Sequence, residues 1–283
     1  MRIDLNNVAQ SIINILTNVD NIPQWSKSWE EGFNVFKPLN WKGVKYNGIN
    51  IFILAGTALA KGYFSPYWMT FKQAKDMGAH IKAGETGTWI IFYSPGGEDD
   101  DGNRIAPQRR SYCVFNVAQI EGLGKNYYTP KLTAKLSDEE RIAHIEDFYF
   151  TRIDSYIRFS PTYSPMYIPS LDLIHMPEFK QFKSAIDYYQ TLGHECIHWT
   201  KHETRLNRNL DGRAMEELVA EIGSFLLNLE LGLQPRLMDD SIPYIKSWVS
   251  AIKEKETAII KAVNMAIKAK DYLLSLTNEE NND

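Results

Sequence analysis

Hydrophobic residues recur at steps of three and four positions near the start of the chain, which is the spacing of one face of an α-helix. The spacing predicts an amphipathic helix whose apolar face is formed by Leu5, Val8, Ile12, Ile15, Leu16 and Val19. We expect this helix to cover a core.

The pattern changes between residues 41 and 117, where helical and strand-like stretches are mixed. We predict helices over 51–60 and 71–77, and strands over 88–94 (TWIIFYS) and 112–117 (YCVFNV). The polar run GGEDDDGNR lies between these strands and is expected to form a hairpin tip. This mixture of elements is typical of a compact α+β domain.

A second domain is predicted to begin near residue 130, so that the chain divides into 1–130 and 131–283. Ser137 and Glu140 have the spacing of a helix N-cap and its partner three residues on, which predicts the start of a charged helix. The proline-punctuated segment 161–177 contains one strand-like run, LDLIHM at 171–176. Further helices are predicted over 216–229, 244–256 and 257–274.

Three of the six histidines lie close together in the stretch TLGHECIHWTKHETR at 191–205. On an α-helix, residues four positions apart lie about 40° apart in projection, so His194 and His198 can direct both rings at one ion with Glu195 beside them. This is the HExxH pattern, and a hydrolytic zinc site needs three protein ligands and one open position. The sequence therefore predicts a Zn²⁺ site on this helix.

The third ligand of such sites is often a carboxylate from the next helix, and RAMEELVAEIGSFLL (213–227) offers three. Carboxylates in so apolar a helix are costly unless they are paired or metal-bound. We assign Glu217 as the third ligand and Glu221 as the acceptor that holds a ligand histidine by its other ring nitrogen. Glu216 is the alternative ligand.

Glu195 is then the candidate general base. Zinc lowers the pKa of its bound water to about 7, and a neighbouring carboxylate can take the proton. His202 continues the same helix face and is an alternative fourth ligand, which would make the zinc structural, although we favour a hydrogen-bonding role. Tyr163, His202 and Arg205 are the candidates for stabilising the transition state.

The other residues of this half suggest less chemistry. His175 is expected to be an ordinary, partly exposed histidine, and Cys196 a small buried apolar residue. Cys113 and Cys196 are far apart in the sequence, so neither a disulfide framework nor a thiolate zinc site is indicated, and we expect a reduced cytoplasmic setting. No run of about 18 apolar residues and no signal-peptide pattern occur, so we predict no membrane partner.

The total charge of −4 does not point to a nucleic acid partner. Residues 1–130 hold 13 basic and 11 acidic side chains (13 − 11 = +2), so a polyanion would favour this domain weakly. Here lysines alternate with aromatics, an arrangement that can neutralise phosphates and stack bases of single-stranded nucleic acid. The alternative is that most of these aromatics belong to the core. The candidate DNA contacts are Trp41, Lys42, Lys45, Tyr46, Trp68, Lys72 and Gln73.

Six stretches together resemble the ArdC-type antirestriction proteins: YNGIN (46–50), WMTFKQAKDMGAHIKAGETGT (68–88), VFNVAQIEGL (114–123), DLIHMP (172–177), YYQTLGHECIHWTKHETRLNR (188–208) and EELVAEIGSFLL (216–227). The C-terminal run 247–274 also resembles the closing helices of that family. The resemblance implies an α+β fold in which a small single-stranded-DNA-binding domain precedes a mainly helical, zincin-like domain of the gluzincin type.

The resemblance also implies a function: a protein of a mobile element that protects incoming DNA from host restriction. It places the family's HExxH on His194, Glu195 and His198, with Glu217 from the acidic helix. The family often has Gly where this chain has Lys201, so the end of the helix and the role of His202 stay open.

Two functions of different class follow. In the first, a zinc metallopeptidase is brought to single-stranded DNA and cleaves a host protein found there. In the second, the first domain shields the strand and the zinc stabilises the fold or regulates binding. A third possibility is a protease that acts on proteins attached to DNA and so repairs DNA–protein adducts. It would use the same two domains.

Overall fold

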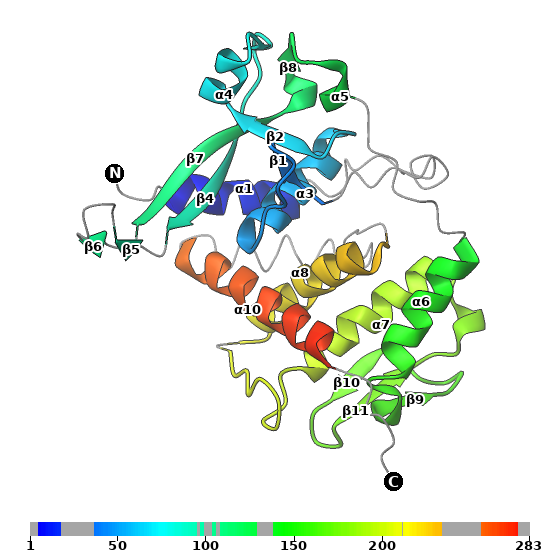
Figure 1. Ribbon diagram of the computed structural model, residues 1–283. Coiled ribbons are helices and arrows are strands. Elements are labelled where there is room, and N and C mark those ends of the chain that lie inside the picture. The colour runs from blue at the N-terminus through cyan, green and yellow to red at the C-terminus, as the bar shows by residue number, and fades with distance from the viewer. Residues whose placement is uncertain are drawn as a thin grey trace. The chain divides into compact units, whose positions relative to one another are not determined.

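The computed structural model describes residues 5–17, 37–94, 97–98, 104–105, 108–128, 138–210, 212–233 and 256–276. The chain divides into two compact units, one of residues 1–133 with 249–260 and the other of residues 134–248 with 261–283. The division into 1–130 and 131–283 stays a prediction. The elements of both units are labelled in Figure 1.

The first unit is built on a four-stranded sheet of order β1-β2-β7-β4. Its strands are β1 (Leu39–Asn40), β2 (Tyr67–Thr70), β7 (Gln108–Asn116) and β4 (Thr88–Ser94). β1 runs parallel to β2, while β7 is antiparallel to both β2 and β4. Two short pairs complete the strands: β3 (His80–Ile81) with β8 (Ile120–Glu121), and β5 (Gly97–Glu98) with β6 (Arg104–Ile105).

Helices α1 (Leu5–Thr17) and α3 (Ile49–Lys61) pack on each other and on β4. α3 is apolar over most of its length and ends at Gly62, whose left-handed conformation (φ 69°) suits a residue without a Cβ. Helix α4 (Phe71–Asp76) begins with a capping box between Thr70 and Gln73, and the short α5 (Lys125–Tyr128) closes the unit. The two predicted helices and two predicted strands of this region are confirmed, and so is the α+β class.

Two residues of the YNGIN and VFNVAQ motifs have structural rather than chemical roles. The side chain of Asn50 accepts a hydrogen bond from the Ile91 N–H at 2.9 Å and donates one to the Ile91 carbonyl at 2.6 Å, so it pairs with edge strand β4 as a neighbouring strand would. Asn116 caps the 3₁₀ turn η2 (Val117–Gln119) and donates to the Ser65 carbonyl. These side chains fix loops to the sheet.

The second unit places a small sheet beside a helical layer. Helix α6 (Asp138–Phe150) leads through the 3₁₀ turn η3 (Asp154–Tyr156) into β9 (Ile157–Phe159), β10 (Met166–Ile168) and β11 (Leu173–Met176). The strand order is β10-β11-β9, with β10 antiparallel and β9 parallel to β11. The run at 171–176 is confirmed as a strand, while β9 and β10 were not predicted.

Helix α7 (Ala185–Trp199) follows the 3₁₀ turn η4 (Phe179–Gln181), and its N-cap Ser184 accepts a hydrogen bond from the Asp187 N–H. α7 packs against α8 (Arg213–Leu231), and α10 (Glu256–Ser275) ends the described chain. The predicted helices at 216–229 and 257–274 are confirmed. The predicted cap at Ser137 and the predicted helix over 244–256 lie outside the described residues, apart from Glu256. None of the described helices is long and apolar enough to cross a membrane.

Two glycines let α7 pack closely on its neighbours: Gly223 of α8 lies against Ile197 of α7, and Gly193 of α7 lies against Tyr149 of α6. A Cβ built on Gly223 would lie 2.9 Å from Ile197, and one on Gly193 would lie 2.8 Å from the Tyr149 hydroxyl. Real Cβ atoms do not approach other heavy atoms so closely, so neither position accepts a larger residue without movement. Because Gly193 directly precedes His194, this packing fixes the position of the histidine.

We expect Gly193→Ala to lower the free energy of unfolding of the metal-free protein by about 1–3 kcal/mol through overpacking, offset in part by about 1 kcal/mol of helix propensity. The Tyr149 hydroxyl is buried and makes no hydrogen bond with the described residues, so Tyr149→Phe should itself change stability little. Denaturant unfolding of the two single variants and the double variant measures the coupling. Additive effects would contradict a direct Gly193–Tyr149 conflict.

Candidate metal centre

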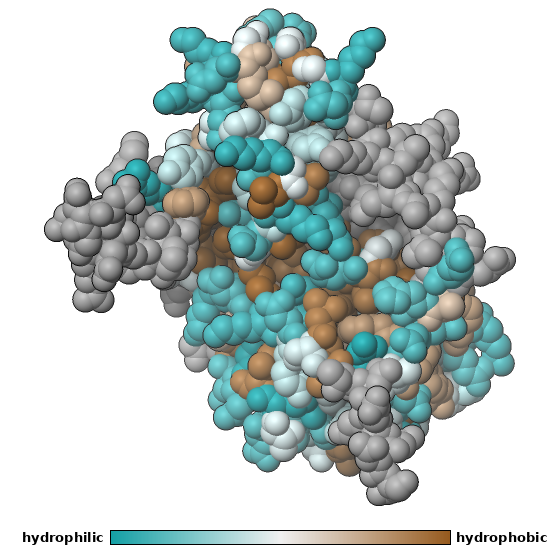
Figure 2. All heavy atoms as spheres, in the orientation of Figure 1, coloured by the Kyte–Doolittle hydropathy of each residue, from teal (hydrophilic) through white to brown (hydrophobic). Residues whose placement is uncertain are grey.

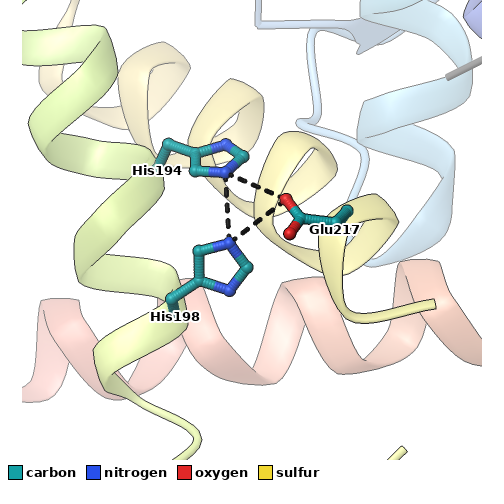
Figure 3. Close-up of side chains that lie close together, drawn as sticks. All are labelled: His194, His198 and Glu217. Atoms are coloured by element: carbon teal, nitrogen blue, oxygen red, sulfur yellow. Dashed lines mark hydrogen bonds and ion pairs between the residues drawn. The ribbon is translucent and has the colours of Figure 1, made fainter. Parts of the chain in front are cut away.

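Helix α7 brings His194 and His198 to the same face, one turn apart, and both rings are buried in the contact with α8. Their Nε2 atoms lie 3.2 Å from each other. From α8, the Glu217 carboxylate reaches the same point: its Oε2 is 3.6 Å from His194 Nε2 and 3.4 Å from His198 Nε2 (Figure 3). These three side chains are the group among the described residues that can hold a metal ion.

The spacing of these atoms fits a tetrahedral ion. A tetrahedron with metal–ligand bonds of about 2.05 Å places its ligand atoms about 3.3 Å apart. The three observed distances of 3.2, 3.4 and 3.6 Å are close to that value. Two imidazole nitrogens and one carboxylate oxygen also form a donor set that suits Zn²⁺ and related divalent ions, with a fourth position left for water or substrate.

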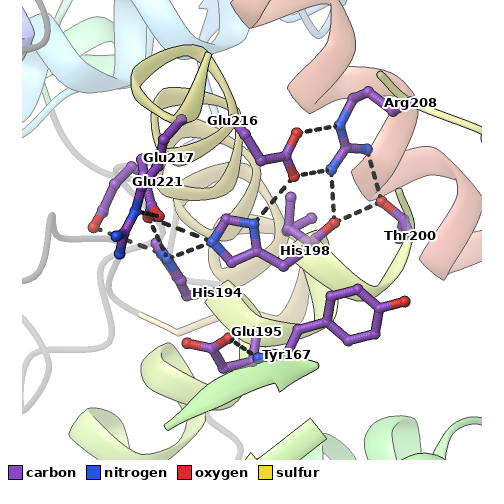
Figure 4. A network of polar contacts seen from close by, with 11 residues as sticks. Tyr167, His194, Glu195, His198, Thr200, Arg208, Glu216, Glu217 and Glu221 are labelled. Atoms are coloured by element: carbon purple, nitrogen blue, oxygen red, sulfur yellow. Dashed lines mark hydrogen bonds and ion pairs between the residues drawn. The ribbon is translucent and has the colours of Figure 1, made fainter. Parts of the chain in front are cut away.

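Another charged side chain lies near each of the three candidate ligands, on the side away from the other two (Figure 4). Glu221 Oε1 lies 3.6 Å from His194 Nδ1, which is beyond hydrogen-bond length but within reach of a small ring movement. Glu216 Oε1 lies 3.1 Å from His198 Nδ1. The Glu217 Oε1 atom, which points away from the histidines, is 3.2 Å from Arg213 Nε.

Glu216 is occupied elsewhere and does not join the ligand group. Arg208, which is buried, donates from Nε to Glu216 Oε2 at 2.9 Å and from a terminal nitrogen to Oε1 at 2.7 Å. The same guanidinium donates to the Thr200 hydroxyl and the Ile197 carbonyl. The structure therefore gives Glu216 the position of a partner of His198, and Glu217 the position of a ligand.

The charges of the cluster depend on one another. Burial alone would lower the pKa of His198, but hydrogen bonds to Glu216 and Glu217 outweigh it and raise that pKa to about 9. Burial opposes the ionisation of Glu217, yet contacts with His194 and His198 hold the pKa of its carboxyl well below its usual range. In the metal-free cluster His198 therefore keeps its proton, and a metal ion must displace that proton to bind.

Glu195 lies beside the ligands and faces a pocket of about 690 Å³. Its Oε2 accepts a hydrogen bond of 2.7 Å from the main-chain N–H of Tyr167, which belongs to edge strand β10 (Figure 4). The pocket is lined by Pro165, Met166, Tyr167, His194, Glu195, His198, Lys201, Arg208, Asn209, Leu210, Gly212, Arg213, Glu216 and Glu217. A carboxylate at this pocket, beside three side chains that can hold a metal ion, is consistent with the general base that the sequence predicts.

Other predicted residues lie away from this pocket. Helix α7 ends at Trp199, so His202 turns away from the ligands and its Nδ1 bonds to the Thr204 hydroxyl at 2.9 Å, in keeping with the hydrogen-bonding role. Arg205 forms an ion pair with Asp172 and lies 3.8 Å from the centroid of the Trp199 ring. None of the three candidate transition-state residues is among the residues that line the pocket, and the transition-state stabiliser stays unassigned.

The remaining two residues of this unit behave as ordinary side chains. Tyr163 stacks on His175 with ring centroids 4.0 Å apart, and the histidine is partly exposed as expected. Cys196 is fully buried, which confirms the prediction, and burial raises the pKa of its thiol. Sequence reasoning missed Tyr167, Lys201, Arg208 and Arg213, although the cost of burying Glu216 could have indicated that it needed a cationic partner.

The candidate DNA contacts divide into exposed and internal side chains. Trp68 is only 1% exposed, so it belongs to the core and its prediction as a stacking residue is wrong. Gln73 completes the cap of α4, while Trp41 and Tyr46 are partly buried, and burial raises the pKa of Tyr46 to about 12. The three lysines that the sequence singled out are exposed: Lys42, Lys45 and Lys72.

Comparison with known proteins agrees with this arrangement. Residues 5–121 match the family model described as the N-terminal domain of anti-restriction factor ArdC, and residues 143–265 match a zincin-like metallopeptidase model. The metal-free crystal structure of antirestriction ArdC from plasmid R388 is 36% identical, covers 94% of this chain and 96% of that chain, and has a TM-score of 0.67. The chain belongs to the ArdC antirestriction family. The resemblance seen in the sequence, including the zincin-like second domain, is confirmed.

Other relatives of this ArdC-family protein extend the comparison. The Mn(II)-bound structure of the R388 ArdC protein is 35% identical, covers 99% of both chains and has a TM-score of 0.67. An uncharacterised protein y4eC of Sinorhizobium fredii is 34% identical over 86% of this chain and 82% of its own length. Two Escherichia coli DNA primases TraC are 35% and 33% identical over 90% of this chain, but this chain spans only 26% and 19% of their lengths. The fold and the ligand atoms both suit a divalent metal.

We expect Glu217→Gln to weaken divalent metal binding by more than about 100-fold, beyond the 10- to 100-fold typical of residues that only orient a ligand. Glu216→Ala should have a different signature, because it leaves the buried Arg208 charge unpaired and lowers the free energy of unfolding by about 3–5 kcal/mol. Competition with a chromophoric chelator and denaturant unfolding in chelator separate the two effects. A larger loss of metal affinity in the Glu216 variant would reverse the assignment.

Proposed function

We propose that this ArdC-family protein protects incoming DNA in the cytoplasm by binding single-stranded DNA and acting as a zinc-dependent peptidase on a host protein found there. The observation that carries the peptidase part is the position of Glu195 at the open pocket, beside His194, His198 and Glu217. A bound zinc ion would lower the pKa of a water molecule to about 7 and would polarise a substrate carbonyl.

This chain's own residues would have separate tasks in that reaction. His194, His198 and Glu217 hold the metal, and Glu216 and Glu221 set the orientation of the two rings. Glu195 takes a proton from water and later transfers it to the leaving amine. The Tyr167 N–H keeps the Glu195 carboxylate oriented and leaves its other oxygen for the proton.

We expect Glu195→Gln to keep metal affinity and fold while lowering peptide hydrolysis by about 10²- to 10⁴-fold, because only the proton acceptor is removed. The measurements are metal content, DNA binding and protection of transferred DNA, wild type and variant side by side. Protection lost together with hydrolysis supports the peptidase. Full protection by the variant would favour the second candidate, in which the DNA-binding domain shields the strand and the metal only stabilises the fold.

The DNA-binding part of the proposal is supported by the arrangement of the first unit. β1 and β2 are parallel neighbours with Asn40 opposite Trp68, so the segments that follow them emerge at the same end of the sheet. The first is the turn that carries Lys42 and Lys45, closed by hydrogen bonds to the Asn40 side chain, and the second is the start of α4. Cationic side chains from both therefore gather at this end of the sheet.

An exposed aromatic residue accompanies these lysines. Phe71, the first residue of α4, is 57% exposed and directly precedes Lys72. On the face seen in Figure 2, the surface around α4 is mainly hydrophilic with hydrophobic side chains between. A strand whose phosphates meet lysines can stack a base on such a ring, so Phe71 takes the role that the sequence had given to Trp68.

Replacing Lys42, Lys45 and Lys72 together by Gln should weaken single-stranded DNA binding and reduce the slope of log K against log salt by about 2, since each phosphate contact contributes about 0.7. Phe71→Ala should cost about 1–3 kcal/mol of binding if one base stacks there. Fluorescence anisotropy over a salt series measures both. The matched controls are exposed residues of the second unit, Lys180→Gln, Lys183→Gln and Phe159→Ala. An unchanged salt slope in the triple variant would place the DNA surface elsewhere.

A further inference from the structure

The pocket in front of the metal centre contains a cation that forms no ion pair with a carboxylate among the described residues. Lys201 lines this pocket two residues after the end of α7, and its Nζ lies 5.7 Å from the centroid of the Tyr167 ring. This cation–π contact is its only interaction among the residues that the structure describes, whereas the pocket's two arginines are both paired with carboxylates.

The formal charges of the side chains that line the pocket cancel one another before a metal ion is counted. Arg208 pairs with Glu216 and Arg213 with Glu217, so these four charges cancel, and Lys201 balances Glu195 (+1 − 1 = 0). A divalent ion held by two neutral histidines then gives a surplus of +2. Glu221, which lies behind His194 and does not line the pocket, lowers this surplus to +1. The loaded pocket is therefore cationic, and its one unpaired side-chain cation among the described residues is Lys201.

The ammonium has a defined position relative to the reacting groups. Tyr167 supports Lys201 with its ring and holds Glu195 with its main-chain N–H. The Tyr167 ring is itself fixed, because its hydroxyl donates to the Asp172 carboxylate at 2.9 Å and Asp172 is held by Arg205. One residue of edge strand β10 thus links the candidate general base to the free cation.

We propose that Lys201 is a specificity residue that selects substrates with an acidic side chain next to the bond to be cleaved. This inference rests on the proposed peptidase function and names its substrate class: a peptide segment carrying Asp or Glu. A single carboxylate matches the surplus charge of +1, whereas a nucleic acid strand would bring several phosphates to a pocket with one unpaired side-chain cation among the described residues.

The test measures binding rather than turnover. The Glu195→Gln protein is loaded with Zn²⁺ and titrated with fluorescent peptides of equal length in which Glu, Gln or Lys is placed in turn at each central position. We expect the best Glu peptide to bind roughly 5- to 20-fold more tightly than its Gln counterpart, an effect between that of an exposed ion pair and that of a fully buried charged hydrogen bond. In the same background, Lys201→Gln should abolish this preference and Lys201→Glu should reverse it in favour of Lys.

Two controls separate the pocket from general charge. Lys183→Gln removes an exposed lysine of the same unit that does not line the pocket, and it should leave the Glu preference intact. Chelator-treated protein should bind all the peptides weakly, because the carbonyl next to the selected side chain then lacks the metal.

Several outcomes would overturn the inference. Equal binding of Glu and Gln peptides, or a Glu preference that survives Lys201→Gln, would refute it while leaving metal-dependent peptide binding, and hence the peptidase proposal, intact. Lys201-dependent displacement of the peptide by a short oligonucleotide would identify a phosphate as the anion instead. If no peptide binds in a metal-dependent manner, both the specificity and the peptidase proposals fail.

Discussion

The close packing of α7 on α8 is the constraint on which the metal centre depends. Two ligands come from one helix and the third from the other, so the donor atoms can converge only if the helices approach closely. Gly223 of α8 permits this approach, since a side chain there would meet Ile197 of α7 at less than 3 Å, and Gly193 likewise permits the approach of α7 to Tyr149 of α6. Apolar residues such as Leu192, Leu218, Val219 and Ile222 are buried nearby in the same two helices and stabilise the contact.

The same packing buries the acidic residues of α8, and burying a charged carboxylate costs free energy. Glu216 and Glu221 are almost completely buried, and carboxylates in such a place destabilise a fold unless each charge is compensated. Arg208 compensates Glu216, while the histidines compensate the others, which is why His198 retains a proton in the metal-free state. A divalent ion replaces this proton with a stronger positive charge at the same point, so metal binding and stability of the second unit are coupled.

The parts of the fold and site that the sequence predicted are those with strong local periodicity or fixed spacing. HExxH specifies two rings on one helix face by geometry alone, and the apolar face of α8 identified the helix that supplies Glu217. Strands β9 and β10 were not predicted, because a strand of three residues near prolines shows no alternating pattern. The role of Tyr167, which lies in β10, was missed for the same reason. Its contribution to Glu195 is a main-chain N–H, which any residue type can provide. Trp68 was misassigned because the sequence pattern of an aromatic residue near lysines does not show whether the ring faces the solvent or the core. In this structure the ring faces the core.

The proposed combination of a DNA-binding surface with a weakly selective protease site would have a kinetic consequence. One cation in an open pocket gives modest discrimination between peptides, of the size that a single contact allows, and such a site would cleave many proteins if it met them freely. A domain that holds the chain on single-stranded DNA raises the effective concentration of proteins bound to the same strand, without any new contact at the pocket. Selectivity would then depend both on whether the substrate protein is bound to the same DNA strand and on whether it has an acidic side chain next to the bond to be cleaved. On this argument, the affinity of the first unit for DNA and the charge of Lys201 act on the same substrate choice, and weakening either should broaden it.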